Sequence, residues 1–179
     1  METVGRCYWL WFVLCVTNAV DDFENQTRLL LGGPLRATTK IKQIFSSVFR
    51  KTPRIIKTDA KTAELVKYVT NAFLSTKVSF ANEMYQICDE LKIDYDKVVE
   101  YSIYDERLGK SHWAVPGPDG KLGFGGSCFP KDIQAIINFA DDLGLSMDTL
   151  KGAWKTNLKV RPEKDWEKLE GRAITKGKK

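Results

Sequence analysis

Cys128 lies in a glycine-rich segment, residues 123–132, with the sequence GFGGSCFPKD. The three glycines allow a ligand to approach the backbone closely, and Pro130 fits the first turn of a helix, where its missing N–H is not needed. Apolar residues then follow at helical spacing: Ile133, Ile136, Ile137 and Ala140. This pattern places Cys128 at the positive end of a helix with Lys131 nearby, a setting that favours a nucleophilic thiolate. The alternative interpretation is a buried structural cysteine.

Three further residues are candidates to act with this thiol. Lys67 and Asn71 are four apart in a predicted helix, so an ammonium and an amide project from one face, a single turn apart. Asp132 lies one turn after Cys128, where a carboxylate is suited to orient water or relay a proton. Donors fixed in this way stabilise charge that develops on an oxygen. The alternative is a solvated helix face and a first-turn acid that matches the helix dipole.

The elements that must position these residues alternate between strands and helices. Strands are predicted over 27–31 and 54–57, on either side of a helix over 35–49. Asp59 is the predicted N-cap of a long helix, whose apolar stripe comprises Leu65, Val66, Val69, Ala72, Phe73, Phe80, Met84, Ile87 and Leu91.

Shorter helices complete the chain. Asp94 or Asp96 caps a helix through Ile103, and Gly109–Gly126 is an irregular loop suited to a lid or a pocket wall. The helix after Pro130 is expected to stop near Gly144. A last helix, capped by Ser146, is expected to end at Pro162 and to be followed by an exposed tail.

The segment with Cys128 resembles the active-site signature of the UDP-glucose/GDP-mannose dehydrogenase family. Residues 63–83, AELVKYVTNAFLSTKVSFANE, are similar to the long central helix of the same family and lie upstream in the correct order. Weaker similarity is seen at 22–28 with Gly32 and Gly33, and at 105–109. The resemblance runs from about residue 18 to about residue 160, most of the chain.

This resemblance implies an α+β fold that is mainly α. It divides the chain into an atypical apolar head (1–19), the end of a Rossmann-like NAD-binding domain with two short strands and a helix (20–58), a helical central domain built on one long helix (59–161) and a basic tail (162–179). The central helix is the dimer core of the family. A homodimer is therefore expected.

The resemblance also implies a function, the oxidation of UDP-glucose to UDP-glucuronate in two NAD-dependent steps, through a thiohemiacetal and a thioester on Cys128. Lys67, Asn71 and Asp132 assist the sulfur. Arg107 reaches the sugar site of the neighbouring subunit, unless it forms a local ion pair of little energetic value. Substrate contacts fall on Phe124, Gly125 and Phe129. His112, a lone loop histidine, is expected to be exposed and is given no catalytic role.

The sequence contains no G-x-G-x-x-G between a strand and a helix, so the main NAD site is expected to be missing from this chain. Lys131 is the candidate for a remaining cofactor contact. The expectation is a catalytic and dimerisation fragment that is inactive in isolation. The alternative is a non-catalytic remnant or dimerising interaction module. The sugar nucleotide is not fixed by the sequence, although the central helix favours UDP-glucose over UDP-N-acetyl sugars or GDP-mannose.

The composition limits the size of the core and the kinds of ligand that are expected. A chain of 179 residues with 43% hydrophobic residues can bury one ordinary core. The net charge of +5 comes partly from the last four residues, and basic and aromatic residues do not interleave, so no nucleic acid partner is expected. Four cysteines without metal-ligand spacing and a single histidine indicate no metal site.

The apolar run at 7–16 after Arg6 has the outline of a signal peptide and is too short to span a bilayer. Because the family resemblance begins directly after it and no Ala-x-Ala cleavage pattern is present, we favour an upstream coding sequence that was lost or read in another frame. The expected location is cytoplasmic, without membrane association. Secretion is the alternative if residues 1–20 are a true signal peptide.

Overall fold

The computed structural model describes residues 8–10, 28–48 and 54–169. The chain divides into two compact units, residues 1–69 and 70–179. Among the described residues no helix is long and apolar enough to cross a membrane. The α+β, mainly α fold class expected from the sequence is confirmed.

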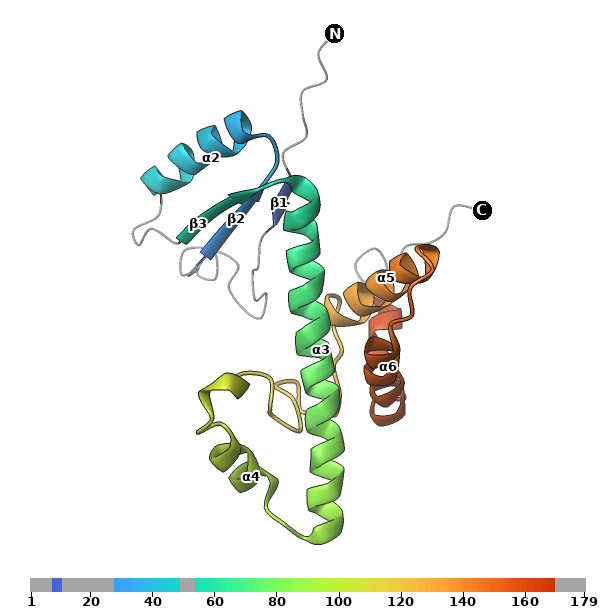
Figure 1. Cartoon of the computed structure of the whole chain (residues 1–179). Helices are drawn as coiled ribbons and strands as arrows, with labels where there is room; N and C mark the ends of the chain where they lie inside the picture. Colours follow the sequence, from blue (N-terminus) through green and yellow to red (C-terminus); the bar gives the residue numbers. More distant parts are fainter. Residues whose placement is uncertain (1–7, 11–27, 49–53, 170–179) are drawn as a thin grey trace. The chain divides into compact units, whose positions relative to one another are not determined.

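The first unit is built on a three-stranded sheet in the order β1-β2-β3 (Figure 1). Strand β2 (Arg28–Gly32) pairs in parallel with β3 (Arg54–Thr58), and α2 (Leu35–Val48) connects them. Leu29 and Leu31 both pack with Phe45 of α2, because side chains two apart in a strand lie on the same face of the sheet. The predicted strand–helix–strand unit is confirmed by these bounds.

The third strand, β1 (Tyr8–Leu10), pairs antiparallel with β2. It falls within the segment that the sequence interpretation treated as an apolar head outside the fold. The run at 7–16 is apolar throughout and has no alternating pattern, so periodicity gave no sign of a strand there. The other residues of the head lie outside the described part of the chain.

Helix α3 (Ala60–Leu91) begins in the first unit and continues into the second. Its predicted cap is confirmed, since the Asp59 carboxylate accepts from the Thr62 backbone N–H at 2.9 Å. Helix α4 (Tyr95–Ser102) is capped by Asp94, the first of the two predicted alternatives. Two hydrophobic clusters pack against α3 in the second unit. One contains Ala81, Cys88, Tyr95 and Val115, and the other contains Phe124, Ile133, Ile137 and Ala153.

Helices α5 (Phe129–Asp142) and α6 (Asp148–Val160) complete the second unit, and two predictions near α6 are wrong. Its N-cap is Met147, without a side-chain capping hydrogen bond, and the Ser146 hydroxyl donates to the Asp148 carboxylate at 2.5 Å. The segment after Pro162 is not an exposed tail, since η2 (Asp165–Lys168) buries Trp166 against Trp154, with 5.3 Å between the ring centroids. Residues 170–179 lie outside the described part.

Candidate active site

Cys128 is an exposed free thiol at the N-cap of α5. The first turn forms as the sequence predicts, because the Asp132 N–H donates to the Cys128 carbonyl at 2.9 Å and Pro130 lies where no N–H is required. The sulfur makes no capping hydrogen bond, and the Ser127 hydroxyl oxygen lies 3.9 Å from it. The thiol is therefore accessible at a helix end that favours negative charge.

Asp132 links this helix start to α3. Its side chain is 1% exposed and accepts from Asn71 Nδ2 at 2.6 Å, while Lys131 forms an ion pair with its other oxygen. A buried carboxylate needs such partners, since its desolvation is costly without them. The structure thus brings together Asn71 and Asp132, which are 61 residues apart in the sequence.

Lys67 lies one turn before Asn71 on α3, within the first unit. It is half-buried, and its Nζ is 5.4 Å from the centre of the Tyr68 ring. The helical spacing that predicted a shared face for Lys67 and Asn71 is therefore present.

The glycine-rich loop before Cys128 is held by side chains from two helices. Phe124 N–H donates to Asn157 Oδ1 at 2.7 Å, and Asn157 Nδ2 donates back to the Phe124 carbonyl at 3.0 Å. Gly123 N–H donates to Asn82 Oδ1 at 3.0 Å. Gly123 has a φ of 68°, and a Cβ there would overlap the Asn157 amide. The positive φ and the lack of space for a Cβ therefore each require a glycine at this position.

Arg161, which is 2% exposed, contacts the same loop at Asp119 and Leu122. Its guanidinium donates to Asp165 at 2.7 and 2.9 Å and to Asp119 at 2.6 Å. Burial disfavours the charged guanidinium, but the hydrogen bonds to both carboxylates outweigh that effect and raise the pKa of Arg161. A side chain at Gly125 would overlap this guanidinium. The loop is therefore anchored by buried polar groups.

The ring of Phe124 is buried in the second unit's core, 6.0 Å from each of the Phe129 and Trp154 rings, and its expected contact with the substrate stays a prediction. One expectation, about His112, needs correction. His112 was expected to be exposed, but it is half-buried, with its ring 5.7 Å from that of Phe129. Burial, together with the charge of Lys77, lowers the pKa of His112.

Arg107 is highly exposed, with 88% of its side chain accessible, and pairs with Asp105 at 2.5 Å between Nη2 and Oδ2. This is the local ion pair that the sequence left open as the alternative. Lys77, which is buried, donates to the carbonyls of Leu108 and Gly109 at 2.8 and 3.0 Å. These bonds fix the turn after Arg107 to α3.

A family model for the central domain of the UDP-glucose/GDP-mannose dehydrogenases matches residues 61–159, more than half of the chain. This chain belongs to that family. The match contains α3, the loop at 109–126, Cys128 and most of α6. The family resemblance carried by the two sequence motifs is thereby confirmed.

Among individual dehydrogenases of the family, UDP-glucose 6-dehydrogenase of Pseudomonas aeruginosa is 34% identical over 145 residues, which cover 80% of this chain and 31% of that protein. The Haloferax volcanii enzyme of the same name is 36% identical over 163 residues, or 89% of this chain and 36% of that one. A solved UDP-glucose dehydrogenase from the archaeon Pyrobaculum islandicum matches with a TM-score of 0.71 and 35% identity, covering 84% of this chain and 33% of that one. The chain thus spans about a third of the length of these relatives.

The sequence did not predict that the loop before Cys128 is held by Asn82, Asn157 and Arg161 in this member of the dehydrogenase family. A signal for two of them exists, because Asn157 and Arg161 continue the spacing of the apolar residues Leu150, Ala153 and Trp154 on α6. Polar residues on an otherwise apolar helix face are buried when the helix packs, and they then require partners. Phe124 and Asp119 lie 33 and 42 residues away, so only the folded structure reveals these two partners, whereas Asp165 lies four residues after Arg161.

Proposed function

We propose that this chain provides the cysteine-bearing central domain of a nucleotide-sugar 6-dehydrogenase that converts UDP-glucose to UDP-glucuronate. The observation that carries the proposal is the 2.6 Å bond between Asn71 Nδ2 and Asp132 Oδ2. It joins the central-helix motif to the first turn of the helix that Cys128 begins. The relatives that are UDP-glucose 6-dehydrogenases support the substrate.

In the proposed reaction, the Cys128 thiolate attacks the C6 aldehyde of the sugar. A carbon–sulfur bond forms, the carbonyl π electrons move to oxygen, and that oxygen takes a proton to give a thiohemiacetal. The N-terminal end of α5 favours both the thiolate before attack and the negative oxygen after it. Exposure of the sulfur leaves it accessible to this electrophile.

Asn71 and Lys67 are proposed to donate hydrogen bonds to the developing oxygen charge. Loss of one such donor in comparable sites costs about 10²–10³ in rate. Because one Asn71 N–H is bonded to the buried Asp132 carboxylate, the amide orientation is fixed before the substrate arrives. Asp132 is thus a positioning residue for Asn71, and Lys131 balances its charge.

NAD, the hydride acceptor implied by the family resemblance, does not fit the residues of this chain alone. The sequence contains no G-x-G-x-x-G. Gly32 ends strand β2 and Gly33 follows it, but a Cβ at Gly32 would overlap the Cβ of Ala63, so the close approach there is to α3 rather than to a ligand. We therefore confine the proposal to the sulfur chemistry. Oxidation of the alcohol to the aldehyde, and of the thiohemiacetal to the thioester, would each require a hydride acceptor such as NAD held by residues outside this chain. In the last step, water attacks the thioester carbonyl, the carbon–sulfur bond breaks, and the carboxylate, the Cys128 thiolate and two protons are released.

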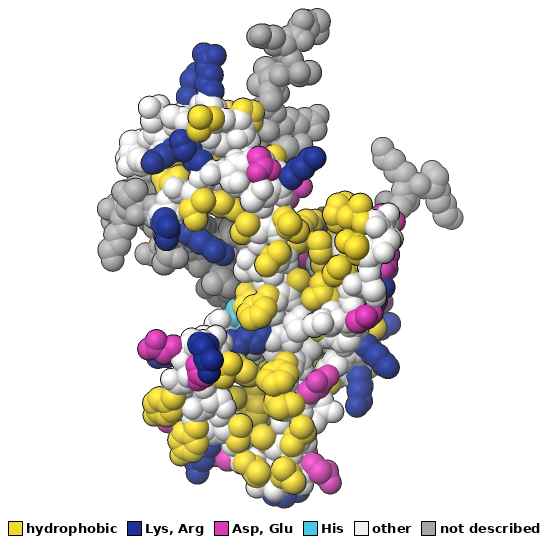
Figure 2. Space-filling model, viewed as in Figure 1, with side chains coloured by type: hydrophobic (Ala, Val, Ile, Leu, Met, Phe, Trp, Pro, Cys, Tyr) yellow, Lys and Arg dark blue, Asp and Glu magenta, His cyan; other side chains and the backbone are white. Residues whose placement is uncertain are grey.

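A homodimer is part of the proposal. Figure 2 shows hydrophobic side chains gathered over α3 and α4. On α3, Phe73, Phe80, Ile87 and Leu91 remain exposed, and their spacing places them on one face. Burying each such side chain is worth roughly 1.5–3 kcal/mol, so a second copy packed on this stripe would be stabilised. The ion pair between Arg107 and Asp105 is exposed and so of little energetic value. In a dimer, Arg107 is proposed to exchange it for the sugar site of the other copy. The same exposed stripe also favours the second candidate, a dimerising module without turnover.

Protection of Cys128 from alkylation distinguishes the two candidates. We expect the C6 aldehyde of UDP-glucose to slow iodoacetamide labelling of Cys128, because the thiohemiacetal occupies the sulfur. UDP, which lacks the aldehyde, is the matched control and should protect less. Equal protection by both compounds, or none by either, would leave the dimerising module as the better account.

A further inference from the structure

One segment of the first unit is strongly basic. Residues 27–58 contain eight lysines and arginines and no aspartate or glutamate, so the charge of this segment is larger than the net charge of +5 of the whole chain. Six of the eight lie on strands β2 and β3 and helix α2, and the other two lie outside the described residues. A surface with one sign of charge and no counter-charge on the same segment attracts ions of the opposite sign. This segment is therefore suited to an anionic ligand.

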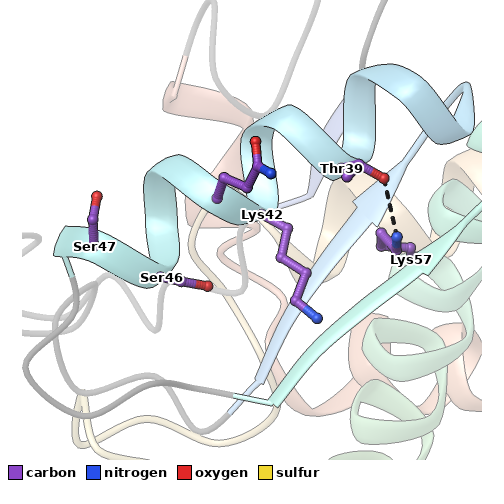
Figure 3. A pocket seen from close by; sticks show the side chains of 6 residues that line it. Thr39, Lys42, Ser46, Ser47 and Lys57 are labelled. Atoms are coloured by element: carbon purple, nitrogen blue, oxygen red, sulfur yellow. Dashed lines mark hydrogen bonds between the residues drawn. The ribbon is translucent and has the colours of Figure 1, made fainter.

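A hollow of about 550 Å³ lies between α2 and β3 within this basic segment (Figure 3). It is lined by Thr39, Lys42, Gln43, Ser46, Ser47 and Lys57. Thr39, Lys42 and Ser46 are three and four residues apart and so share a face of the helix. In Figure 3 the side chains of Lys42 and Ser46 extend on the side of α2 that faces β3, whereas Ser47 points away.

Hydrogen-bond donors dominate the hollow. Lys57 Nζ donates to Thr39 Oγ1 at 3.1 Å, so the Thr39 hydroxyl hydrogen can be offered to a ligand. Lys42 and Lys57 each carry an ammonium, and Ser46 adds a second hydroxyl. The Ser47 hydroxyl instead donates to the Ile44 carbonyl at 2.7 Å, within the helix. Two cations with two hydroxyl donors match a ligand with several negative oxygens and no hydrogens of its own to donate.

We propose that this hollow binds a linear phosphate chain, either inorganic or carried by a nucleotide. The hollow of about 550 Å³ is much larger than one phosphate group, and its two cations come from different elements, so a chain of phosphates can contact Lys42 and Lys57 together. None of the six lining residues is aromatic. Proteins that bind single-stranded nucleic acid stack bases on aromatic side chains, so the lining favours a phosphate chain over a nucleic acid.

Calorimetric titration of the full chain tests this site, with inorganic tripolyphosphate, UTP, UMP and a single-stranded oligonucleotide as probes at about 0.15 M salt. Tripolyphosphate and UTP should bind with similar affinity, and UMP about tenfold more weakly, because it offers one phosphate to two cations. Similar values for tripolyphosphate and UTP identify the chain itself as the recognised group. A clear preference for UTP would assign recognition to the nucleoside and contradict the proposal.

Charge-matched variants locate the site. Lys42→Gln and Lys57→Gln should each weaken tripolyphosphate binding by about tenfold. Lys40→Gln removes the same charge from the same helix outside the hollow and should change the affinity by less than about twofold. Thermal unfolding of each variant verifies that the fold is retained. Equal weakening by all three variants, absence of tripolyphosphate binding, or tighter binding of the oligonucleotide would overturn the proposal.

Discussion

The side chain of Asn157 pairs with both backbone polar groups of Phe124, accepting from its N–H at 2.7 Å and donating to its carbonyl at 3.0 Å. Both residues are buried. The two bonds replace the water that would otherwise solvate the glycine-rich loop, and they hold that loop four residues before Cys128. The position of the thiol is therefore coupled to helix α6.

Asn157→Ala should destabilise the second unit, because it leaves a buried N–H and a buried carbonyl unpaired. The expected loss is about 2–4 kcal/mol in the free energy of unfolding. Urea unfolding followed by tryptophan fluorescence, to which Trp154 and Trp166 of the second unit contribute, measures it. Lys155→Ala, an exposed position on the same helix, is the control and should change stability by less than about 0.5 kcal/mol. Equal effects would show that the Asn157 bonds do not hold the loop.

Local signals in the sequence predicted much of the fold. The Asp59 cap and the 3.6-residue period identified α3, and Pro130 marked the start of α5. The contacts of Asn157 with Phe124, of Arg161 with Asp119 and of Trp166 with Trp154 were not predictable in this way, because each depends on a partner far away in the sequence or on the packing of a short irregular segment. Ser146 is not the cap, because α6 begins one residue later than a Ser146 cap requires, with Met147 at the N-cap.

Asp165→Asn should lower stability near neutral pH by about 1–3 kcal/mol, because the buried guanidinium of Arg161 loses a charged partner. Hydrogen bonds from Arg161 lower the pKa of Asp165 below its ordinary value of 3.8. A carboxyl with a lowered folded pKa stabilises the protein above its unfolded pKa and loses that contribution as the pH falls through the folded value.

The stability difference between the wild type and Asp165→Asn should therefore be constant from about pH 5 to 8 and shrink below about pH 3.8. Urea unfolding at a series of pH values measures it, and Glu167→Gln, an exposed neighbour, is the control. A difference that does not change with pH would assign the effect to packing rather than to charge.

Iodoacetamide at neutral pH should modify Cys128 at least about tenfold faster than Cys88. Cys128 is exposed at a helix start, whereas Cys88 is buried against Tyr95 and Val115. Peptide mass spectrometry over time gives both rates. Comparable rates would show that burial does not shield Cys88, or that the helix start does not activate Cys128.

Sedimentation equilibrium at micromolar concentration should show a dimer of the 20.4 kDa chain. Phe73 is 66% exposed on α3, and Phe73→Asp should weaken association by about tenfold or more, since it places a charge in the proposed interface. Phe139→Asp, on the exposed side of α5, is the matched control and should leave the dimer intact. A wild-type monomer would contradict the shared sugar site.

A double-mutant cycle on aldehyde binding tests the central claim most directly, namely that Asn71 and Asp132 act as one unit beside the Cys128 thiol. The affinity for the C6 aldehyde of UDP-glucose is read from the protection of Cys128 against alkylation in the wild type, Asn71→Ala, Asp132→Ala and the double variant. Each single substitution should weaken binding of the aldehyde by at least about tenfold, and the double variant should bind it little more weakly than either single variant. Unchanged affinity in the single variants, or losses that simply add, would contradict the account.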